Sequence, residues 1–222
     1  LSDTSETFMV RFAPTTTGDI DGTLSFDTSS VAHPGLVYNV SGTGVYPNAG
    51  KLQFVEYNKN DSLGNAGLDG AYGVNVSPDG KHVYTSSQTD HAIAIFDRDM
   101  TTGALTYLDD VTNAEIGGTG LGGAENIAFS PDGRHVYANG YADNAISVFS
   151  RDATTGLLTF VEAITNTDIG GTGLATAERL ACSPDGAHVY VTGRGDAALT
   201  VFRRDNDTGR LTFIEVNLDG QD

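Results

Sequence analysis

The chain has 222 residues, with 28 Gly, no Trp, a single Cys and a formal net charge of −17. That acidic balance argues against nucleic acid as a partner, because binding to phosphates requires a basic surface. No run of 18 apolar residues occurs, so we expect no membrane insertion. The lone Cys182 excludes an internal disulfide framework and a zinc site built from cysteines.

Residues 1–46 predict part of an immunoglobulin-like β-sandwich. Apolar and polar residues alternate at 8–12, 20–26 and 36–40, which indicates three antiparallel strands with one buried face. The pattern Phe-x-Val-x-Phe-x-Pro, then Gly-x-Leu-x-Phe, then Val-Ser-Gly-Thr-Gly-Val resembles the C-terminal half of an ASPM/SPD-2/hydin-like (choice-of-anchor type) domain. We therefore expect a partial Ig-like domain at 1–46 and a second domain at 47–222.

A period of 53 residues organises the second domain. Ser-Pro-Asp-Gly begins at Ser77, Ser130 and Ser183, and 103–155 matches 156–208 at 29 of 53 positions. Each unit holds four short stretches rich in β-branched and aromatic residues, bounded by Gly, Asp and Thr. In the second unit these strands are predicted at 125–130, 135–139, 145–151 and 158–164, and a leading fourth-type strand is predicted at 52–57.

Four strands in a repeat of this length are typical of a β-propeller blade. The fold class predicted is therefore all-β, with about three four-stranded blades of an incomplete ring after the partial Ig-like sandwich. Ser-Pro-Asp-Gly-x-x-Val-Tyr, followed by Val-Phe-x-Arg-Asp-x-x-Thr-Gly-x-Leu-Thr-Phe, resembles the lactonase-type seven-bladed propellers, whose members include 6-phosphogluconolactonase and muconate-lactonising proteins. Seven units would need about 370 residues, so we expect a segment of a longer polypeptide or a ring completed by other chains.

Candidate catalytic residues lie where long connections return to the innermost strands. The connections at 113–125 and 166–178 have no apparent structure of their own, and such loops are often functional. In lactonase-type propellers the substrate site lies at the channel mouth and uses acidic, His and Arg side chains. The resemblance therefore points to Glu125, Glu178 and Arg179.

Other recurring polar residues have structural interpretations. The aspartates of Ser-Pro-Asp-Gly are predicted to serve the turn, and the histidines that follow are predicted to be structural. The recurring arginines predict either a blade-to-blade ion pair or a solvated hairpin, and Cys182 predicts a small buried hydrophobe. These series are Asp79, Asp132 and Asp185; His82, His135 and His188; and Arg98, Arg151 and Arg204.

Signals for a cofactor are weak. No helix follows the Gly-Gly-Thr-Gly stretches, so a phosphate site is not indicated. Asn58, Asn60, Asp61 and Asp69 offer the oxygen ligands that Ca²⁺ prefers, although their spacing lacks the acidic density of an EF-hand. We expect no cofactor, with Ca²⁺ as the one alternative.

Three functions fit these observations. The leading hypothesis is a non-enzymatic module of a larger secreted or surface-associated bacterial protein, located outside the cell or at its surface. Its propeller would act as an interaction platform or assembly subunit for other chains or for the remainder of a longer polypeptide. The first alternative is a lactonase-type hydrolase, in which an acid and an Arg at the channel mouth polarise a lactone carbonyl and activate water. The second is a Ca²⁺-stabilised adhesive or filament subunit.

Overall fold

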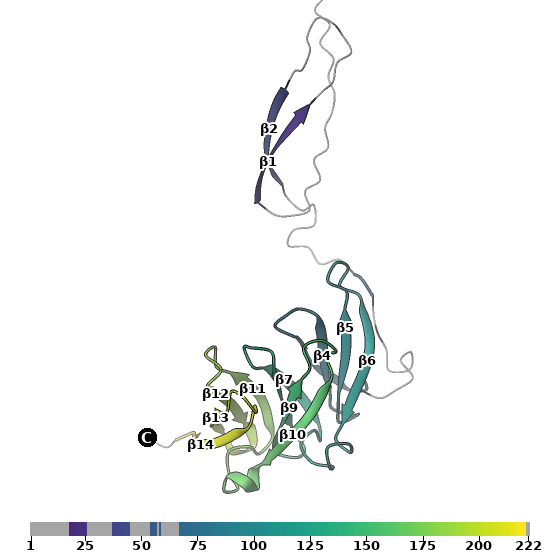
Figure 1. The fold of residues 1–222 in the computed structure, drawn as a ribbon. Coiled ribbons are helices and arrows are strands. Elements are labelled where there is room, and N and C mark those ends of the chain that lie inside the picture. The colour runs from purple at the N-terminus through teal and green to yellow at the C-terminus, as the bar shows by residue number, and fades with distance from the viewer. Residues whose placement is uncertain (1–17, 26–36, 45–53, 57, 59–66, 221–222) are drawn as a thin grey trace, which may run out of the picture. The chain divides into compact units, whose positions relative to one another are not determined.

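The computed structural model describes residues 18–25, 37–44, 54–56, 58 and 67–220. The chain divides into two compact units, Leu1–Phe54 and Val55–Asp222. In the first unit, β1 (Gly18–Ser25) and β2 (Val37–Gly44) form an antiparallel hairpin (Figure 1). Two of the three strands predicted there are therefore present, and the one at 8–12 lies outside the described residues. The Ig-like assignment and its boundary at residue 46 stay predictions.

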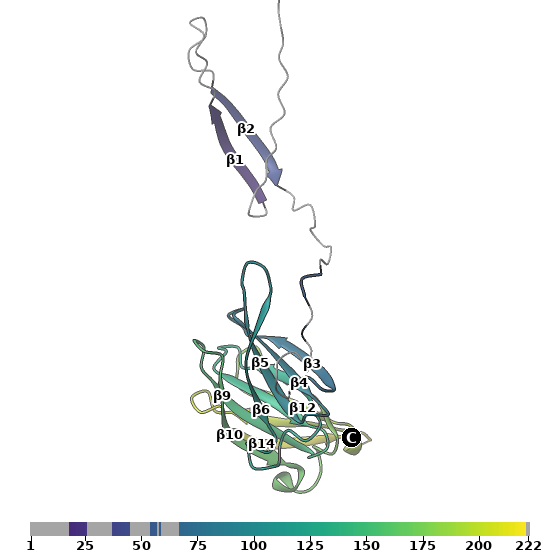
Figure 2. The ribbon, with the colours of Figure 1, turned by 90° about the vertical axis from the view of Figure 1, so that its right-hand side faces the viewer.

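The second unit contains three four-stranded antiparallel meanders, which we call blades 1, 2 and 3 (Figures 1 and 2). Blade 1 comprises β3 (Ala71–Val76), β4 (His82–Ser87), β5 (Ala92–Arg98) and β6 (Leu105–Thr112). Blade 2 comprises β7 (Ala124–Phe129), β8 (His135–Gly140), β9 (Ala145–Arg151) and β10 (Leu158–Thr165). Blade 3 comprises β11 (Ala177–Cys182), β12 (His188–Gly193), β13 (Ala198–Arg204) and β14 (Leu211–Leu218).

The all-β prediction and the predicted strands of the second repeat are thus confirmed. The helical segments among the described residues are two short 3₁₀ turns, Asn166–Ile169 and Arg194–Asp196. No helix in the described part of the chain is long and apolar enough to cross a membrane. Of the predicted strand at 52–57, residues 54–56 are described and are not assigned to a strand, while 52, 53 and 57 lie outside the described residues.

Local hydrogen bonds explain why each repeat folds as a meander. In the Ser-Pro-Asp-Gly turn of blade 2, the amide of Gly133 donates to the carbonyl of Ser130 at 2.8 Å, and Gly133 has a φ of 69°. A β-carbon is unfavourable at that φ, which is why the turn requires Gly. In the next hairpin, Asp152 Oδ1 accepts from the amides of Thr154 and Thr155, so this aspartate closes its own turn.

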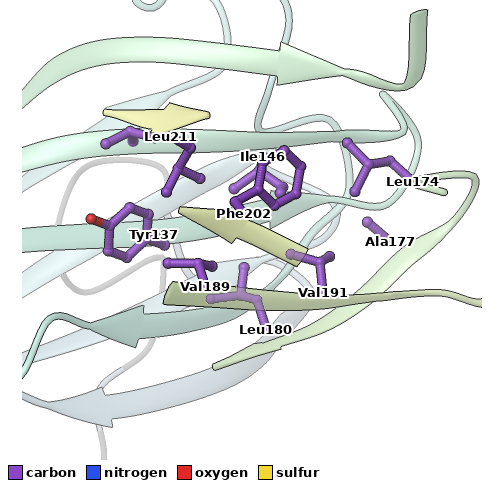
Figure 3. Packing of buried hydrophobic residues seen from close by; sticks show 10 residues of the cluster. Tyr137, Ile146, Leu174, Ala177, Leu180, Val189, Val191, Phe202 and Leu211 are labelled. Carbon is purple, nitrogen blue, oxygen red and sulfur yellow. The ribbon is translucent and has the colours of Figure 1, made fainter. Parts of the chain in front are cut away.

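Hydrophobic packing joins neighbouring blades. The innermost strands β3, β7 and β11 are neighbours, with β7 in the middle. Tyr137 and Ile146 of blade 2 pack against Leu174, Val191 and Phe202 of blade 3, and all five are buried (Figure 3). Burying a large apolar side chain contributes roughly 1.5–3 kcal/mol, so this shared core is a main source of stability for the three blades.

A buried arginine adds a polar connection between blades. Arg151 of β9 donates to the hydroxyl of Tyr84 at 2.8 Å and lies 2.8 Å from His82 Nδ1, both in blade 1. Its Nη2 is also 3.0 Å from the carboxylate of Asp79. Of the two predicted environments for this arginine, the blade-to-blade ion pair is confirmed.

The next interface repeats these contacts with the residues 53 positions later. Arg204 donates to the hydroxyl of Tyr137 at 2.7 Å, lies 2.8 Å from His135 Nδ1 and pairs with Asp132 at 3.5 Å. Burial lowers the pKa of His135, and the charge of Arg204 lowers it further. Both effects favour the uncharged imidazole, and the histidine at this position serves the contact between blades, which agrees with the predicted structural role.

Candidate functional site

Each innermost strand begins with a β-bulge. Its pairing with the second strand skips from Ala71 to Gly73 in blade 1, from Ala124 to Ile127 in blade 2, and from Ala177 to Arg179 in blade 3. A bulge leaves the extra residue unpaired and re-aims its side chain, and bulges are frequent next to active sites. The residues released in this way include Tyr72, Glu125 and Glu178.

Glu125 is the most buried acid at these bulges, with 4% of the residue exposed. Its Oε1 accepts a hydrogen bond of 2.8 Å from Gln88 Nε2, which follows strand β4 of blade 1. Burial raises the pKa of Glu125 above its ordinary value, although the Gln88 hydrogen bond partly offsets this. The negative charge of Glu178 acts in the same direction as burial.

Blade 3 adds two cations and a second acid. Glu178 Oε1 accepts from Arg194 Nη1 at 3.1 Å. The exposed guanidinium of Arg179 lies 5.6 Å from the ring centroid of Tyr72, so these side chains meet across the width of blade 2. The charges of Arg179 and Arg194 both act on Glu125 and lower its pKa. We call Tyr72, Gln88, Glu125, Glu178, Arg179 and Arg194 the acid–arginine cluster.

This cluster holds the groups that acid–base chemistry at a carbonyl needs. A carboxyl group whose pKa is raised toward the working pH is suited to general-base catalysis. A guanidinium with free N–H groups can stabilise the negative charge that develops on a carbonyl oxygen. Glu125 supplies the first feature, and Arg179, which is exposed, supplies the second.

Aspartates of the second-to-third-strand hairpins anchor the long connections that lead into the bulges. Asp143 Oδ2 accepts from the amides of Gly120 and Gly122 at 2.6 and 2.8 Å. Asp196 Oδ2 makes the equivalent pair of hydrogen bonds in blade 3, to Gly173 and Ala175. The connections are therefore ordered by side chains, and the start of each inner strand is held in place.

The three residues that the sequence pointed to, Glu125, Glu178 and Arg179, all belong to the cluster. The sequence did not indicate Gln88, Arg194 or Tyr72. These three occupy positions at which the repeats differ, since residues 88, 141 and 194 are Gln, Tyr and Arg. A position whose residue changes from one repeat to the next, while its surroundings stay constant, is the sequence signal that could have indicated these residues.

The remaining candidates do not converge. Asn60 and Asp61 of the proposed Ca²⁺ set lie outside the described residues, Asn58 donates to Glu56, and Asp69 is exposed. Among residues 18–25, 37–44 and 67–220 with the few described between them, no three His, Cys, Asp or Glu side chains form a group that could hold a metal ion. Cys182 is partly buried against the blade 2–blade 3 core, and burial raises its pKa.

Curated relatives of this chain carry an enzyme name. The 6-phosphogluconolactonase of Pectobacterium carotovorum is 25% identical over 147 residues, which cover 66% of this chain and 43% of that protein. The 6-phosphogluconolactonase of Cronobacter sakazakii is 24% identical over 84% of this chain and 58% of its own length. The chain thus spans about half the length of these relatives.

Solved structures with similar sequences share the fold of this chain. The periplasmic gluconolactonase of Pseudomonas aeruginosa is 27% identical with a TM-score of 0.56, and the match covers 64% of this chain and 38% of that one. A Lactobacillus plantarum protein is 28% identical with a TM-score of 0.56 over 65% of this chain and 40% of its own.

The leading hypothesis of a non-enzymatic structural module is wrong, because the relatives are named as lactonases. The physical reason is that the residues that define the repeat form turns, core and blade contacts, which carry no chemistry. The cluster that could carry it combines residues of the bulges, such as Glu125 and Glu178, with Gln88 and Arg194, which occupy a position at which the repeats differ.

A family model described as lactonase, 7-bladed β-propeller matches residues 39–168 and 120–221. The two matches together cover most of the chain and include all three blades. With its three meanders, their shared cores and this match, the chain belongs to the lactonase family of seven-bladed β-propellers.

Proposed function

We propose that this protein hydrolyses lactones and that the acid–arginine cluster carries the reaction. The observation that supports this most directly is the placement of Glu125. It is buried at a bulge, its pKa is raised, and two arginines act on its charge. The names of the relatives suggest sugar-acid lactones, phosphorylated or not, as the substrate class.

In the proposed reaction, Glu125 is the general base. Its carboxylate takes a proton from water while the water oxygen forms a bond to the lactone carbonyl carbon. Arg179 donates to the carbonyl oxygen, on which negative charge develops. The tetrahedral intermediate then breaks the bond to the ring oxygen, which takes up the proton held by Glu125. The product is the open-chain hydroxy acid, which ionises at neutral pH.

Supporting residues have distinct roles in this proposal. Gln88 holds one oxygen of Glu125 and directs the other toward water. Arg194 pairs with Glu178 and so compensates the second negative charge near the base. Tyr72 lies under the guanidinium of Arg179 and restricts its position.

The experiment is a hydrolysis assay on the chain with glucono-δ-lactone and 6-phosphoglucono-δ-lactone, in which acid release is followed at constant pH. Spontaneous hydrolysis is subtracted, and p-nitrophenyl acetate serves as an open-chain ester for comparison. We expect acceleration of lactone hydrolysis with little effect on the ester. Equal rates with and without protein for every lactone would refute the proposal.

We also infer that the protein acts outside the cytoplasm. The similar Pseudomonas aeruginosa protein is named as periplasmic, and the strongly acidic composition is compatible with such a location. Cell fractionation with an antibody to the chain tests this inference, and recovery with cytoplasmic markers alone would contradict it.

A further inference from the structure

A buried amide side chain joins the bulges of blades 2 and 3. Asn139, in β8, has no exposed surface. Its Oδ1 accepts from the amide of Asn126 at 2.7 Å, and its Nδ2 donates to the carbonyl of Ala177, the first residue of β11. Both polar ends of the side chain therefore have partners, as a buried amide requires, and these partners belong to different blades.

The bond to Asn126 caps the bulge that presents the proposed base. The pairing of β7 with β8 skips Glu125 and Asn126. The side chain of Asn139 takes the place of a ladder partner for the Asn126 amide. Asn139 therefore supports the backbone directly beside Glu125.

Shorter side chains provide the same cap in the other two blades. Ser86 Oγ accepts from the amide of Gly73 at 3.0 Å in blade 1. Thr192 Oγ1 accepts from the amide of Arg179 at 3.2 Å in blade 3. Each hydroxyl uses its single oxygen for the cap, whereas Asn139 has a second polar atom that extends to the next blade. The contact with blade 3 is therefore an addition at this repeat position, and the bulge itself does not require it.

Two asparagines of blade 2 hold the bulge of blade 3 from both sides, and we call Asn126 and Asn139 the asparagine clamp. Asn139 binds the carbonyl of Ala177, and Oδ1 of Asn126 accepts from the amide of Leu180 at 3.2 Å. The two residues between these anchored positions are the acid and the arginine at the blade 3 bulge. Their backbone is thus tied to blade 2 at each end.

Glu125 is held on its other side by blade 1. A β-carbon on Gly73 would collide with the carbonyl oxygen of Glu125, so the two inner strands are in close backbone contact there. The side chain of Glu125 accepts from Gln88, also of blade 1. The base is therefore fixed against blade 1, and its distance from Arg179 depends on how blade 3 is joined to blade 2.

We propose that Asn139 is a positioning residue that fixes the distance between Glu125 and the guanidinium of Arg179. It does so by joining the two bulges through one side-chain amide, while Asn126 holds the far side of the arginine. A base and an oxyanion donor must reach the same substrate carbonyl, and a displacement of about 1 Å can lower a rate by about 10²-fold. The catalytic meaning of this role rests on the proposed function, whereas the position itself can be measured without a substrate.

Asn139→Thr separates the two bonds of this side chain. Threonine caps the bulge at the equivalent position of blade 3, so the variant keeps a cap for Asn126 and loses the bond to Ala177. The matched control is Tyr137→Phe, which removes the 2.9 Å bond from the buried Tyr137 hydroxyl to the Gly209 carbonyl at the same blade interface. That bond lies at the opposite end of the strands, in the hairpin between β13 and β14. Circular dichroism checks that both variants fold.

The first readout is the effect of the Arg179 charge on the pKa of Glu125, measured by ¹³C NMR of labelled glutamate side chains. Glu125→Gln identifies the resonance of Glu125. The charge of Arg179 lowers the pKa of Glu125, so Arg179→Met should raise it. We expect this rise to be at least about halved in an Asn139→Thr background, because a Coulomb interaction weakens with distance, and to be unchanged with Tyr137→Phe. A rise as large with Asn139→Thr as without it would overturn the proposal.

Lactone hydrolysis is the second readout. Asn139→Thr should lower kcat by about 10–10²-fold with a smaller change in KM, while Tyr137→Phe keeps the wild-type rate. A folded Asn139→Thr protein with the wild-type kcat would also overturn the proposal. A wild-type chain that hydrolyses no lactone refutes the proposed function, and the NMR measurement still decides whether Asn139 sets the spacing of Glu125 and Arg179.

Discussion

The guanidinium of Arg151 holds the carboxylate of Asp79 across the interface between blades 2 and 1, with Nη2 3.0 Å from Oδ2. The arginine side chain is 1% exposed and the aspartate 31%. A guanidinium offers five donors in a fixed plane, so one side chain can also serve other acceptors of the preceding blade. This pair therefore fixes how one blade sits on the next.

Replacing this arginine should be costly, whereas its equivalent in blade 1 should be dispensable. Arg151→Ala removes the guanidinium that contacts the buried His82 and donates to the Tyr84 hydroxyl, and we expect a loss of about 2–4 kcal/mol in the free energy of unfolding. Arg98→Ala is the matched control, and it should cost below about 1 kcal/mol. Urea denaturation measures both, and equal losses would contradict the assignment.

Two glycines separate backbone strain from blade packing. Gly156 and Gly103 have nearly equal φ values of 79° and 81°, so alanine pays a similar conformational cost of roughly 1 kcal/mol at each. At Gly156 the new methyl group also collides with the His82 ring. We expect Gly156→Ala to lower the free energy of unfolding by at least about 1–3 kcal/mol more than Gly103→Ala. A smaller effect at Gly156 than at Gly103 would show that the contact is absent in solution.

Stability should fall in two steps as the pH is lowered. Burial and Arg151 lower the pKa of His82 below its ordinary 6.5, so the unfolded chain binds a proton first and stability is lost below about pH 6.5. Burial alone would raise the pKa of Asp79, but hydrogen bonds from Ser77 and Arg151 lower it to about 2. Its contribution is complete above the ordinary 3.8 and is lost between pH 3.8 and about 2.

Urea midpoints from pH 8 down to pH 2.5 would show these steps. Asp79→Asn should remove a part of the lower step and leave the upper step in place. Glu125 has the opposite effect on stability. Because its pKa is raised in the folded chain, its ionisation at a pH above the ordinary pKa of a glutamate lowers the free energy of unfolding. An upper step that persists unchanged after His82 and His135 are both replaced by Gln would refute the assignment of that step.

Gln88 is predicted to be a positioning residue that tunes the base. Its hydrogen bond lowers the pKa of Glu125, so Gln88→Met should move the acid limb of the pH–rate profile for lactone hydrolysis to higher pH. Gln88 is exposed, so the global stability should change little. Asn217→Met, on the exposed outer strand of blade 3, is the control and should leave the profile unchanged. An unshifted acid limb in Gln88→Met would exclude this role.

The fold could be predicted because its causes are local and recur. Ser-Pro-Asp-Gly forms a turn wherever it occurs, and the 53-residue step then places four strands in each blade. The cross-blade pairing was harder to predict, since Arg151 and Asp79 are 72 residues apart and belong to different repeats. The sequence pattern predicted either a blade-to-blade ion pair or a solvated hairpin for the arginine, and the packing of the blades shows that it is the ion pair.

The candidate site was predicted in part. Glu125, Glu178 and Arg179 were indicated by their position at the start of an inner strand, and the structure brings them together. Gln88 and Arg194 reach the same place from neighbouring strands, and a β-bulge sets the direction of the acids. The bulge leaves no mark in a single sequence, and the contacts of Gln88 and Arg194 are marked only by the variation of their position among the repeats.

The central claim is that Glu125 is the base for lactone hydrolysis, and its direct test is the rate with Glu125→Gln. The amide has nearly the same shape and can still accept from Gln88, so the fold should persist while the base is lost. We predict a fall in kcat of about 10²–10⁴-fold, with an unchanged rate in the exposed control Glu215→Gln. A Glu125→Gln protein that is folded and hydrolyses lactones as fast as the wild type would contradict the account.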